Sequence, residues 1–217
     1  MRATARFEQG KSLSFVRRES HSVSVRKGAK VVISGHRAIN LVCYNYIAAK
    51  FFLKLAKAQE DGQFYSCMAA NVFAAFTFEA YLNTVGSGLI RFWSELEYLS
   101  PESKLACVTE QLGISLDAGR RPLQTIKPLV QFRNDIAHGK PATVNAKGIT
   151  VYVERFRDVS EAMAARWEKL CVPAAAERNI QDVYALAEIL HGTGRLKPTL
   201  TTIFGSLGHA SYSRTPT

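Results

Sequence analysis

Hydrophobic positions recur with a helical period over the first long stretch of the chain, residues 38 to about 60. Apolar side chains there follow one another at steps of three and four residues, which places them on one face of a helix. A second, more continuous apolar stretch runs from about residue 63 to residue 85, and Gly86-Ser87-Gly88 is expected to end it. Only a short turn at Asp61-Gly62 separates the two stretches, so the sequence predicts two helices packed antiparallel.

Farther along the chain the pattern predicts shorter helices. Ser100-Pro101 is a typical helix start, with serine as the N-cap and proline at the first helical position, and that helix is expected to end near Gly113. Three further helices are expected at residues 121–138, 160–173 and 174–190. Residues 143–156 include an alternating run of apolar and polar side chains, which predicts a strand or a short hairpin.

The two ends of the chain show no helical period. Residues 20–26 alternate polar and apolar side chains, so either a short hairpin or a disordered arm is expected within residues 1–34. Residues 193–217 are rich in serine and threonine and are expected to form a mobile tail. The sequence therefore predicts an all-α fold, a helical bundle over residues 35–192 with a small β-like insert, a basic N-terminal arm and a C-terminal tail.

The apolar stretch at residues 64–85 is long enough to raise the question of a transmembrane helix. It contains Asn71, Glu79 and Asn83, and a carboxylate near the middle of a bilayer is costly. A central helix that other helices bury on all sides explains the same composition at lower cost. The sequence therefore favours a helix in the protein core and no membrane contact.

Charge divides the chain into three parts. The net charge is +10; residues 1–37 carry nine basic and two acidic side chains, and residues 191–217 carry three basic and no acidic ones. The intervening residues 38–190 carry sixteen of each sign. Basic ends suit an anionic partner such as nucleic acid, because each Lys or Arg placed on a phosphate releases condensed counterions. The alternative is a solvated cationic tail, or one that docks on the domain.

The cysteines and histidines indicate the kind of compartment and exclude some kinds of site. The four cysteines form no C-x-x-C pair and lie in apolar helical runs, which is typical of reduced core cysteines in a cytoplasmic protein. The histidines have no metal-ligand spacing and no nucleotide-binding glycine loop is present, so no metal or cofactor is expected. The first residues lack a continuous apolar stretch and predict no secretory signal.

The helix expected at residues 121–138 carries the residues best suited to chemistry. Positions four apart stack on one face of a helix, so Lys127, Gln131, Asn134 and His138 form a polar stripe, with Arg133 at the edge of the buried side. A neutral histidine can move a proton to or from a ribose hydroxyl, and an arginine can hold a phosphate bidentately. An asparagine can orient the histidine or donate to a phosphate oxygen. This set of side chains suits RNA cleavage without a metal.

A structural role explains the same residues. A histidine just before a helix-ending glycine commonly caps the last carbonyl groups of its helix. Glu79 lies on an apolar helical stripe, and a buried carboxylate requires a cation or several donors. The sequence therefore predicts that Glu79 is buried, with Arg133 as the expected partner.

The segment Phe132–His138 resembles the active-site motif of the HEPN family, an arginine followed after four to six residues by a histidine. Arg133, Asn134 and His138 match that motif, with four residues between arginine and histidine. Three more stretches are similar to the family's form, at residues 78–83, 100–105 and 121–127. The resemblance covers residues 38–140, and more loosely extends to residue 190.

The resemblance implies a helical bundle that forms homodimers and brings two such motifs together in one cleft. Many HEPN proteins are metal-independent endoribonucleases of toxin–antitoxin, phage-defence or RNA-processing systems, and others only bind. We therefore expect an endoribonuclease with His138 as general acid and base, Arg133 as the phosphate ligand and Asn134 as the orienting group. Glu79, Lys127 and Gln131 would support them.

RNA, a second copy of the chain and an antitoxin or regulatory protein are the expected partners. The alternatives are a non-catalytic HEPN module that binds RNA, a nucleotide or a protein, and a dimer in which the motif only stabilises the interface.

Overall fold

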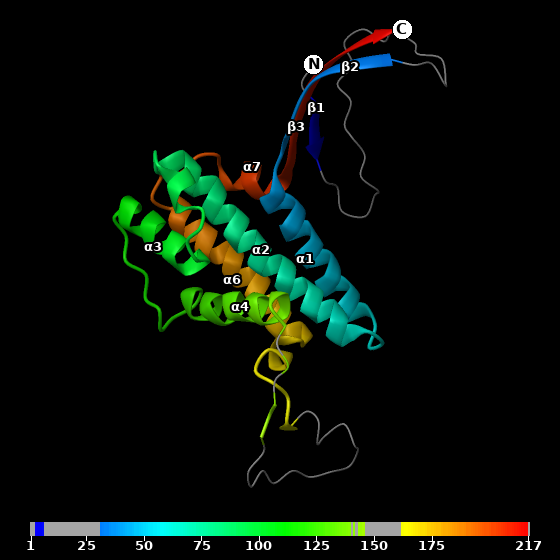
Figure 1. The fold of residues 1–217 in the computed structure, drawn as a ribbon, viewed down its shortest axis with the longest axis vertical. Helices are drawn as coiled ribbons and strands as arrows, with labels where there is room; N and C mark the ends of the chain where they lie inside the picture. The colour runs from blue at the N-terminus through cyan, green and yellow to red at the C-terminus, as the bar shows by residue number, and fades with distance from the viewer. Residues whose placement is uncertain (1–2, 7–30, 140, 142, 146–161, 217) are drawn as a thin grey trace.

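The computed structural model describes residues 3–6, 31–139, 141, 143–145 and 162–216, which form a mostly helical structure with a small sheet at one end (Figure 1). Its helices are α1 (Leu41–Ala58), α2 (Gln63–Leu89), α3 (Pro101–Leu112), α4 (Leu123–Ala137), α6 (Pro173–His191) and α7 (Leu200–Gly205). Two short 3-10 helices are η1 (Trp93–Leu96) and η2 (Glu168–Leu170). The strands are β1 (Ala3–Arg6), β2 (Val31–Ile39) and β3 (Ser206–Pro216).

Helix α2 lies at the centre of the bundle and contacts α1, α3, α4 and α6 (Figure 1). Its buried side chains point to several sides of the helix axis, as its continuous apolar sequence predicts. Small side chains let it pack closely with α1: Ala49 and Ala56 in α1, and Ala70 and Ala74 in α2, are at most 1% exposed. The predicted helix pair is confirmed, and no helix among the described residues is long and apolar enough to cross a bilayer.

The end of α2 differs from the prediction, because the helix continues through Gly86-Ser87-Gly88 to Leu89. The reason is the indole ring of Trp93, which packs on Gly86; a Cβ atom at Gly86 would lie 2.4 Å from Trp93 Cζ2. A glycine inside a helix costs only about 1 kcal/mol relative to alanine. Burial of the indole, which is 3% exposed, offsets that cost.

The predicted ends of α3 are confirmed. Ser100 is the N-cap, and its Oγ accepts a hydrogen bond from the backbone N–H of Ser103 at 3.2 Å. Pro101 occupies the first turn, where backbone N–H groups make no hydrogen bond within the helix, so the lack of an N–H in proline costs nothing there. Gly113 follows the helix with a φ of 70°, a left-handed conformation that favours glycine.

Helix α4 lies within the predicted range of residues 121–138, although it contains Pro128. Arg121 precedes the helix and donates to both carboxylate oxygens of Asp182 in α6, with nitrogen–oxygen distances of 2.7 and 2.9 Å. The Thr125 hydroxyl donates to the same carboxylate. Asp182 is 3% exposed, so one buried carboxylate holds the first turn of α4 against α6.

The region between α4 and α6 differs from the prediction where it is described. Residues 143–145 have no regular secondary structure, and the rest of the strand or hairpin predicted up to residue 156 lies outside the described residues. Of the helix predicted at 160–173, residue 162 is helical, and the prediction is wrong for residues 163–172, which contain turns and η2. Residues 160 and 161 lie outside the described residues. One reason is that the Leu170 carbonyl accepts from the Asn71 amide of α2 at 2.8 Å instead of continuing a helix.

The C-terminal residues do not form the mobile tail that the sequence predicts, because α7 and β3 follow α6. Strand β3 pairs antiparallel with β2, from Val31 opposite Pro216 to Ile39 opposite Gly208, and with β1 on its other side. Strand β2 also continues through Ile39, where a helix was expected. The predicted strand at residues 20–26 lies outside the described residues. Strands pair through backbone groups, so a serine-rich segment can form a strand without an alternating hydrophobic pattern in its sequence. That pattern was therefore not there to predict the strand.

Asn40 joins the sheet to the bundle. Its Oδ1 accepts from the Cys43 backbone N–H at 3.3 Å and so caps the start of α1. Its Nδ2 donates to the carbonyls of Ile203 and Ser206, at 2.8 and 2.7 Å. Carbonyls at the end of a helix lack partners in their own helix. One side chain therefore caps the start of α1 and also pairs with carbonyl groups at the end of α7.

We expect Asn40→Ala to lower the free energy of unfolding by about 2–3 kcal/mol, because it removes an N-cap and leaves α7 carbonyls unpaired. Asn40→Ser keeps a capping oxygen but is too short to reach α7. Its free energy of unfolding should therefore fall by about 1 kcal/mol less than that of Asn40→Ala. Urea unfolding of the three proteins measures both values. Wild-type stability in both variants would contradict this role of Asn40.

Candidate functional site

Packing of α4 on α2 and α6 determines which of its side chains remain accessible. Its buried side chains are Ile126, Leu129, Val130 and Phe132. On the opposite side Lys127, Gln131 and His138 are exposed and Asn134 is half-buried, so the predicted polar stripe is confirmed. His138 follows the last helical residue, and its backbone N–H donates to the Asn134 carbonyl at 2.9 Å.

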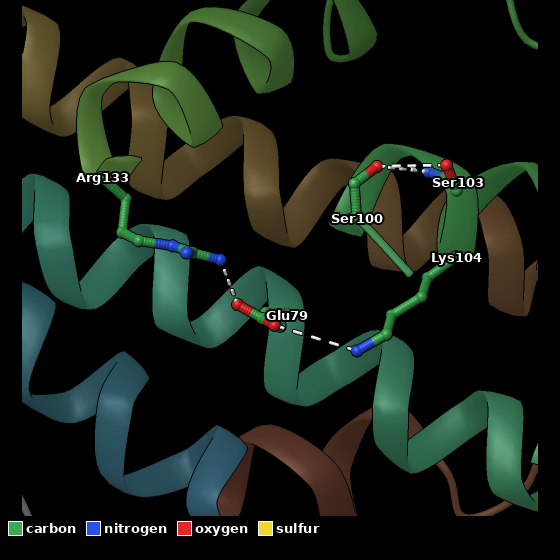
Figure 2. Close-up of polar contacts among 5 residues, drawn as sticks. All are labelled: Glu79, Ser100, Ser103, Lys104 and Arg133. Atoms are coloured by element: carbon green, nitrogen blue, oxygen red, sulfur yellow. Dashed lines mark hydrogen bonds and ion pairs between the residues drawn. The ribbon is translucent and has the colours of Figure 1, made fainter. Parts of the chain in front are cut away.

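Arg133 lies between these two sides and reaches toward α2. Its Nη2 atom donates to Glu79 Oε2 at 2.5 Å, as Figure 2 shows. The predicted partnership of Glu79 with Arg133 is therefore confirmed. The predicted burial holds only in part, because the Glu79 side chain is 30% exposed and that of Arg133 is 19% exposed. Glu79 lies at the edge of the bundle, where α3 and α4 leave its carboxylate partly open to solvent.

A second cation, Lys104 of α3, approaches the same carboxylate from the other side (Figure 2). Its Nζ atom lies 3.8 Å from Glu79 Oε1, and the side chain is 2% exposed. Lys104 belongs to the first turns of α3, where the helix dipole disfavours a positive charge. Glu79 is therefore needed as its counter-charge.

Arg133, Lys104 and Glu79 together carry one net positive charge at an accessible place. A guanidinium has five N–H donors, and the bond from Nη2 to Glu79 is the one side-chain hydrogen bond of Arg133 among the described residues. The remaining donors can bind an anion, such as a phosphate group, while the carboxylate holds the guanidinium in place.

The structure brings only some of the predicted site residues together. It joins Arg133 to Glu79, whereas the His138 side chain makes no hydrogen bond to either of them. Gln131 does not reach Arg133; its Nε2 donates to Asp135 Oδ1 at 2.7 Å on the exposed face of α4. Lys127 extends from the same face and has no side-chain partner among the described residues.

Two residues were missed from the sequence although each carried a signal. Lys104 lies on the buried stripe of α3, next to Pro101, Leu105 and Val108, and a lysine on such a stripe requires a carboxylate. Asp135 lies four residues after Gln131, which is the spacing for side-chain contact on one helix face.

Three of the four cysteines are buried in the bundle, where a thiol is poorly suited to react. All four are free thiols, and burial raises the pKa of Cys171 to about 12. Burial also raises the pKa of Cys43, whose thiol donates to the Phe204 carbonyl. Thiols with raised pKa values are poor nucleophiles at neutral pH. Within the part of the chain that the structure describes, no three His, Cys, Asp or Glu side chains gather as a metal site would require.

Comparison with protein-family models, with curated proteins and with solved structures finds no match to this chain.

Glu79→Ala should destabilise the protein more than Arg133→Ala. The first change leaves the buried Lys104 without a counter-charge, which costs about 3 kcal/mol. The second lowers the free energy of unfolding by about 1 kcal/mol, because the Glu79 carboxylate still has Lys104 as a counter-charge and remains in contact with water. Adding Lys104→Met to Glu79→Ala should restore part of the lost stability. Urea unfolding tests this order, and a larger loss in Arg133→Ala would contradict it.

Proposed function

We propose that this protein is a metal-independent endoribonuclease, built on a helical bundle of HEPN type, that cuts single-stranded or looped RNA. The observation that carries the proposal is the ion pair between Arg133 and Glu79. It holds a half-buried guanidinium about one and a half helical turns before the exposed His138. A positioned cation and an accessible imidazole near one helix end are the groups that cleavage of a ribose–phosphate chain uses.

Each side chain has a distinct role in this proposal. Neutral His138 accepts the proton of a ribose 2′-hydroxyl, which then attacks the adjacent phosphorus, or it returns a proton to the leaving 5′-oxygen. The free N–H groups of Arg133 bind the phosphate and stabilise the charge that develops on it. Glu79 and Lys104 act through Arg133 by fixing its position. Asn134, half-buried between the two, orients His138 or donates to a phosphate oxygen.

A second copy of the chain completes the site in this proposal. In-line displacement at phosphorus benefits from a base on one side and an acid on the other, and one protomer offers one His138. A twofold dimer through the exposed face of α4 places two histidines in one groove. The cellular setting we propose is the cytoplasm, with an antitoxin or regulatory protein as a further partner.

The basic ends of the chain supply affinity for RNA in this scheme. Residues 1–37 and 191–217 together hold twelve of the 28 basic side chains, and strands from both ends lie in one sheet. Each of these basic side chains placed on a phosphate would release condensed counterions.

One observation favours a second candidate, a HEPN-type module that binds RNA or a protein without cutting. The bond from Arg133 to Glu79 is short and links α4 to α2, as a purely structural arginine would. His138 would then serve only as the residue that ends α4.

Cleavage of RNA in the presence of EDTA separates the two candidates. We expect the wild-type protein to cut RNA into products that end in a 2′,3′-cyclic phosphate. A fully 2′-O-methylated RNA, which lacks the attacking hydroxyl, should remain intact. His138→Ala should slow cleavage by about 10²–10⁴-fold, the usual contribution of a general acid or base. Gln124→Ala, an exposed change on the same helix, is the matched control. Cleavage at an equal rate by His138→Ala and wild type would refute the catalytic role.

Mixing two inactive variants tests whether the site is shared between protomers. Arg133→Ala and His138→Ala should each be inactive, and a mixture should regain partial activity if one groove takes its arginine and histidine from different protomers. The measurement is the cleavage rate after the variants are mixed and allowed to exchange subunits. Full activity of a wild-type protein that remains monomeric at the assay concentration would contradict the dimeric site.

A further inference from the structure

A cavity of about 520 Å³ lies where the sheet meets the bundle, away from Arg133 and His138. Its walls come from the end of β2, the start of α1, the second half of α2, α7 and the first residues of β3. A volume of this size is within the range of about 300–1,000 Å³ that is typical of small-molecule sites. Segments from both ends of the chain line it, and it is open to solvent on one side.

Asn83 of α2 lines this cavity and makes no hydrogen bond within the described part of the chain. Its Oδ1 atom is buried and has no partner. A buried acceptor without a partner destabilises a protein, and such atoms are rare in native structures. The Asn83 amide, with one acceptor and two donors, therefore retains unused hydrogen-bonding capacity.

The hydroxyl groups beside Asn83 present acceptors to the cavity. Thr84 donates its proton to the Ala80 carbonyl at 2.8 Å, and Ser87 donates to the Thr84 carbonyl at 3.1 Å. Each hydroxyl has one proton, so what remains for a ligand is the lone pairs of the two oxygens. The cavity therefore favours a ligand that carries several N–H donors.

The other lining residues exclude a strongly charged ligand. No carboxylate, lysine or arginine is among the described lining residues, and His209 is the one ionisable side chain among them. Ile39, Leu41 and Ile203 supply apolar walls. An ammonium group would enter without a counter-ion, which is unfavourable. The chemistry that fits is an uncharged body with an amino group beside a hydrogen-bond acceptor such as a ring nitrogen.

We propose that this cavity binds an amino-substituted nucleobase, adenine or cytosine, either as a free nucleoside or as one base of an RNA chain. The Asn83 amide pairs with the amino group and the adjacent ring nitrogen, as asparagine pairs with adenine. The second proton of the amino group bonds to the Thr84 or Ser87 oxygen. This site is separate from Arg133 and His138, so the proposal does not rest on endoribonuclease activity.

Calorimetric titration of the full-length protein tests the site with adenosine, cytidine and purine riboside, which lacks the amino group. We expect adenosine or cytidine to bind saturably, and purine riboside to bind about ten- to a hundredfold more weakly than adenosine, because both hydrogen bonds of the amino group are lost. Asn83→Ala should reduce the preference for adenosine over purine riboside by about tenfold, because it removes one of the two hydrogen bonds to the amino group. Gln111→Ala, which removes an exposed amide on α3, should leave it unchanged.

A fully 2′-O-methylated oligoadenylate, which no ribonuclease of this type can cut, identifies the source of the base. Competition between this oligomer and adenosine would assign the site to a base within RNA, and binding of adenosine without such competition would assign it to a free nucleoside. Absence of saturable binding by adenosine, cytidine and the oligomer would overturn the proposal. The same holds if purine riboside binds as tightly as adenosine, a comparison that does not depend on any variant.

Discussion

Burial of α2 is the constraint on which the other features depend. A helix covered by α1, α3, α4 and α6 has no access to water for most of its polar groups, so each needs a hydrogen-bond partner within the protein. Asn71 donates to the Leu170 carbonyl and accepts from Asn179 of α6. Tyr81 bonds to His191 near the end of α6, and burial raises its pKa. The polar residues of α2 thus determine which parts of the chain pack against it.

Glu79 satisfies the same requirement with ionic partners, and this links the core to the candidate site. Its carboxylate is shared by Arg133 and Lys104, so three helices meet at one charged group (Figure 2). The arrangement positions Arg133 without consuming all its donors. A cation required for packing is thereby available for binding an anion at the surface. Asn83 is the exception on α2, because its buried oxygen has no partner among the described residues; the residue itself lines a cavity.

The sheet depends on a different kind of interaction. Strands β2 and β3 pair through backbone groups, and the Asn40 amide joins them to α1 and α7. Gly208, at a φ of 113°, lies against Ala38, where a Cβ atom would meet its carbonyl oxygen. Glycine is therefore required where the two strands come together above the bundle. This junction also lines the cavity beside Asn83, so segments near both ends of the chain contribute to its walls.

Local pattern was sufficient to predict the helices whose apolar faces and caps lie within one segment. Spacing along the chain predicts the range of α2 up to its glycines, the Ser100 cap of α3 and the polar stripe of α4. The pairing of Glu79 with Arg133 was also predictable, because a carboxylate on an apolar stripe requires a cation. The second cation, Lys104, carried a similar signal but needed the position of α3 to identify its partner.

Contacts between distant segments decided the rest. Gly86 continues a helix instead of ending it because Trp93 packs on it, and the C-terminal residues form a strand because β2 offers them backbone partners. The periodicity of the sequence predicts neither the continued helix nor the C-terminal strand, because both depend on residues that only folding brings together. The sequence by itself determined the helices, the central position of α2 and the residue types of the candidate site. The tertiary structure decided the sheet, the shared carboxylate and the cavity, because each requires groups from segments far apart in the chain.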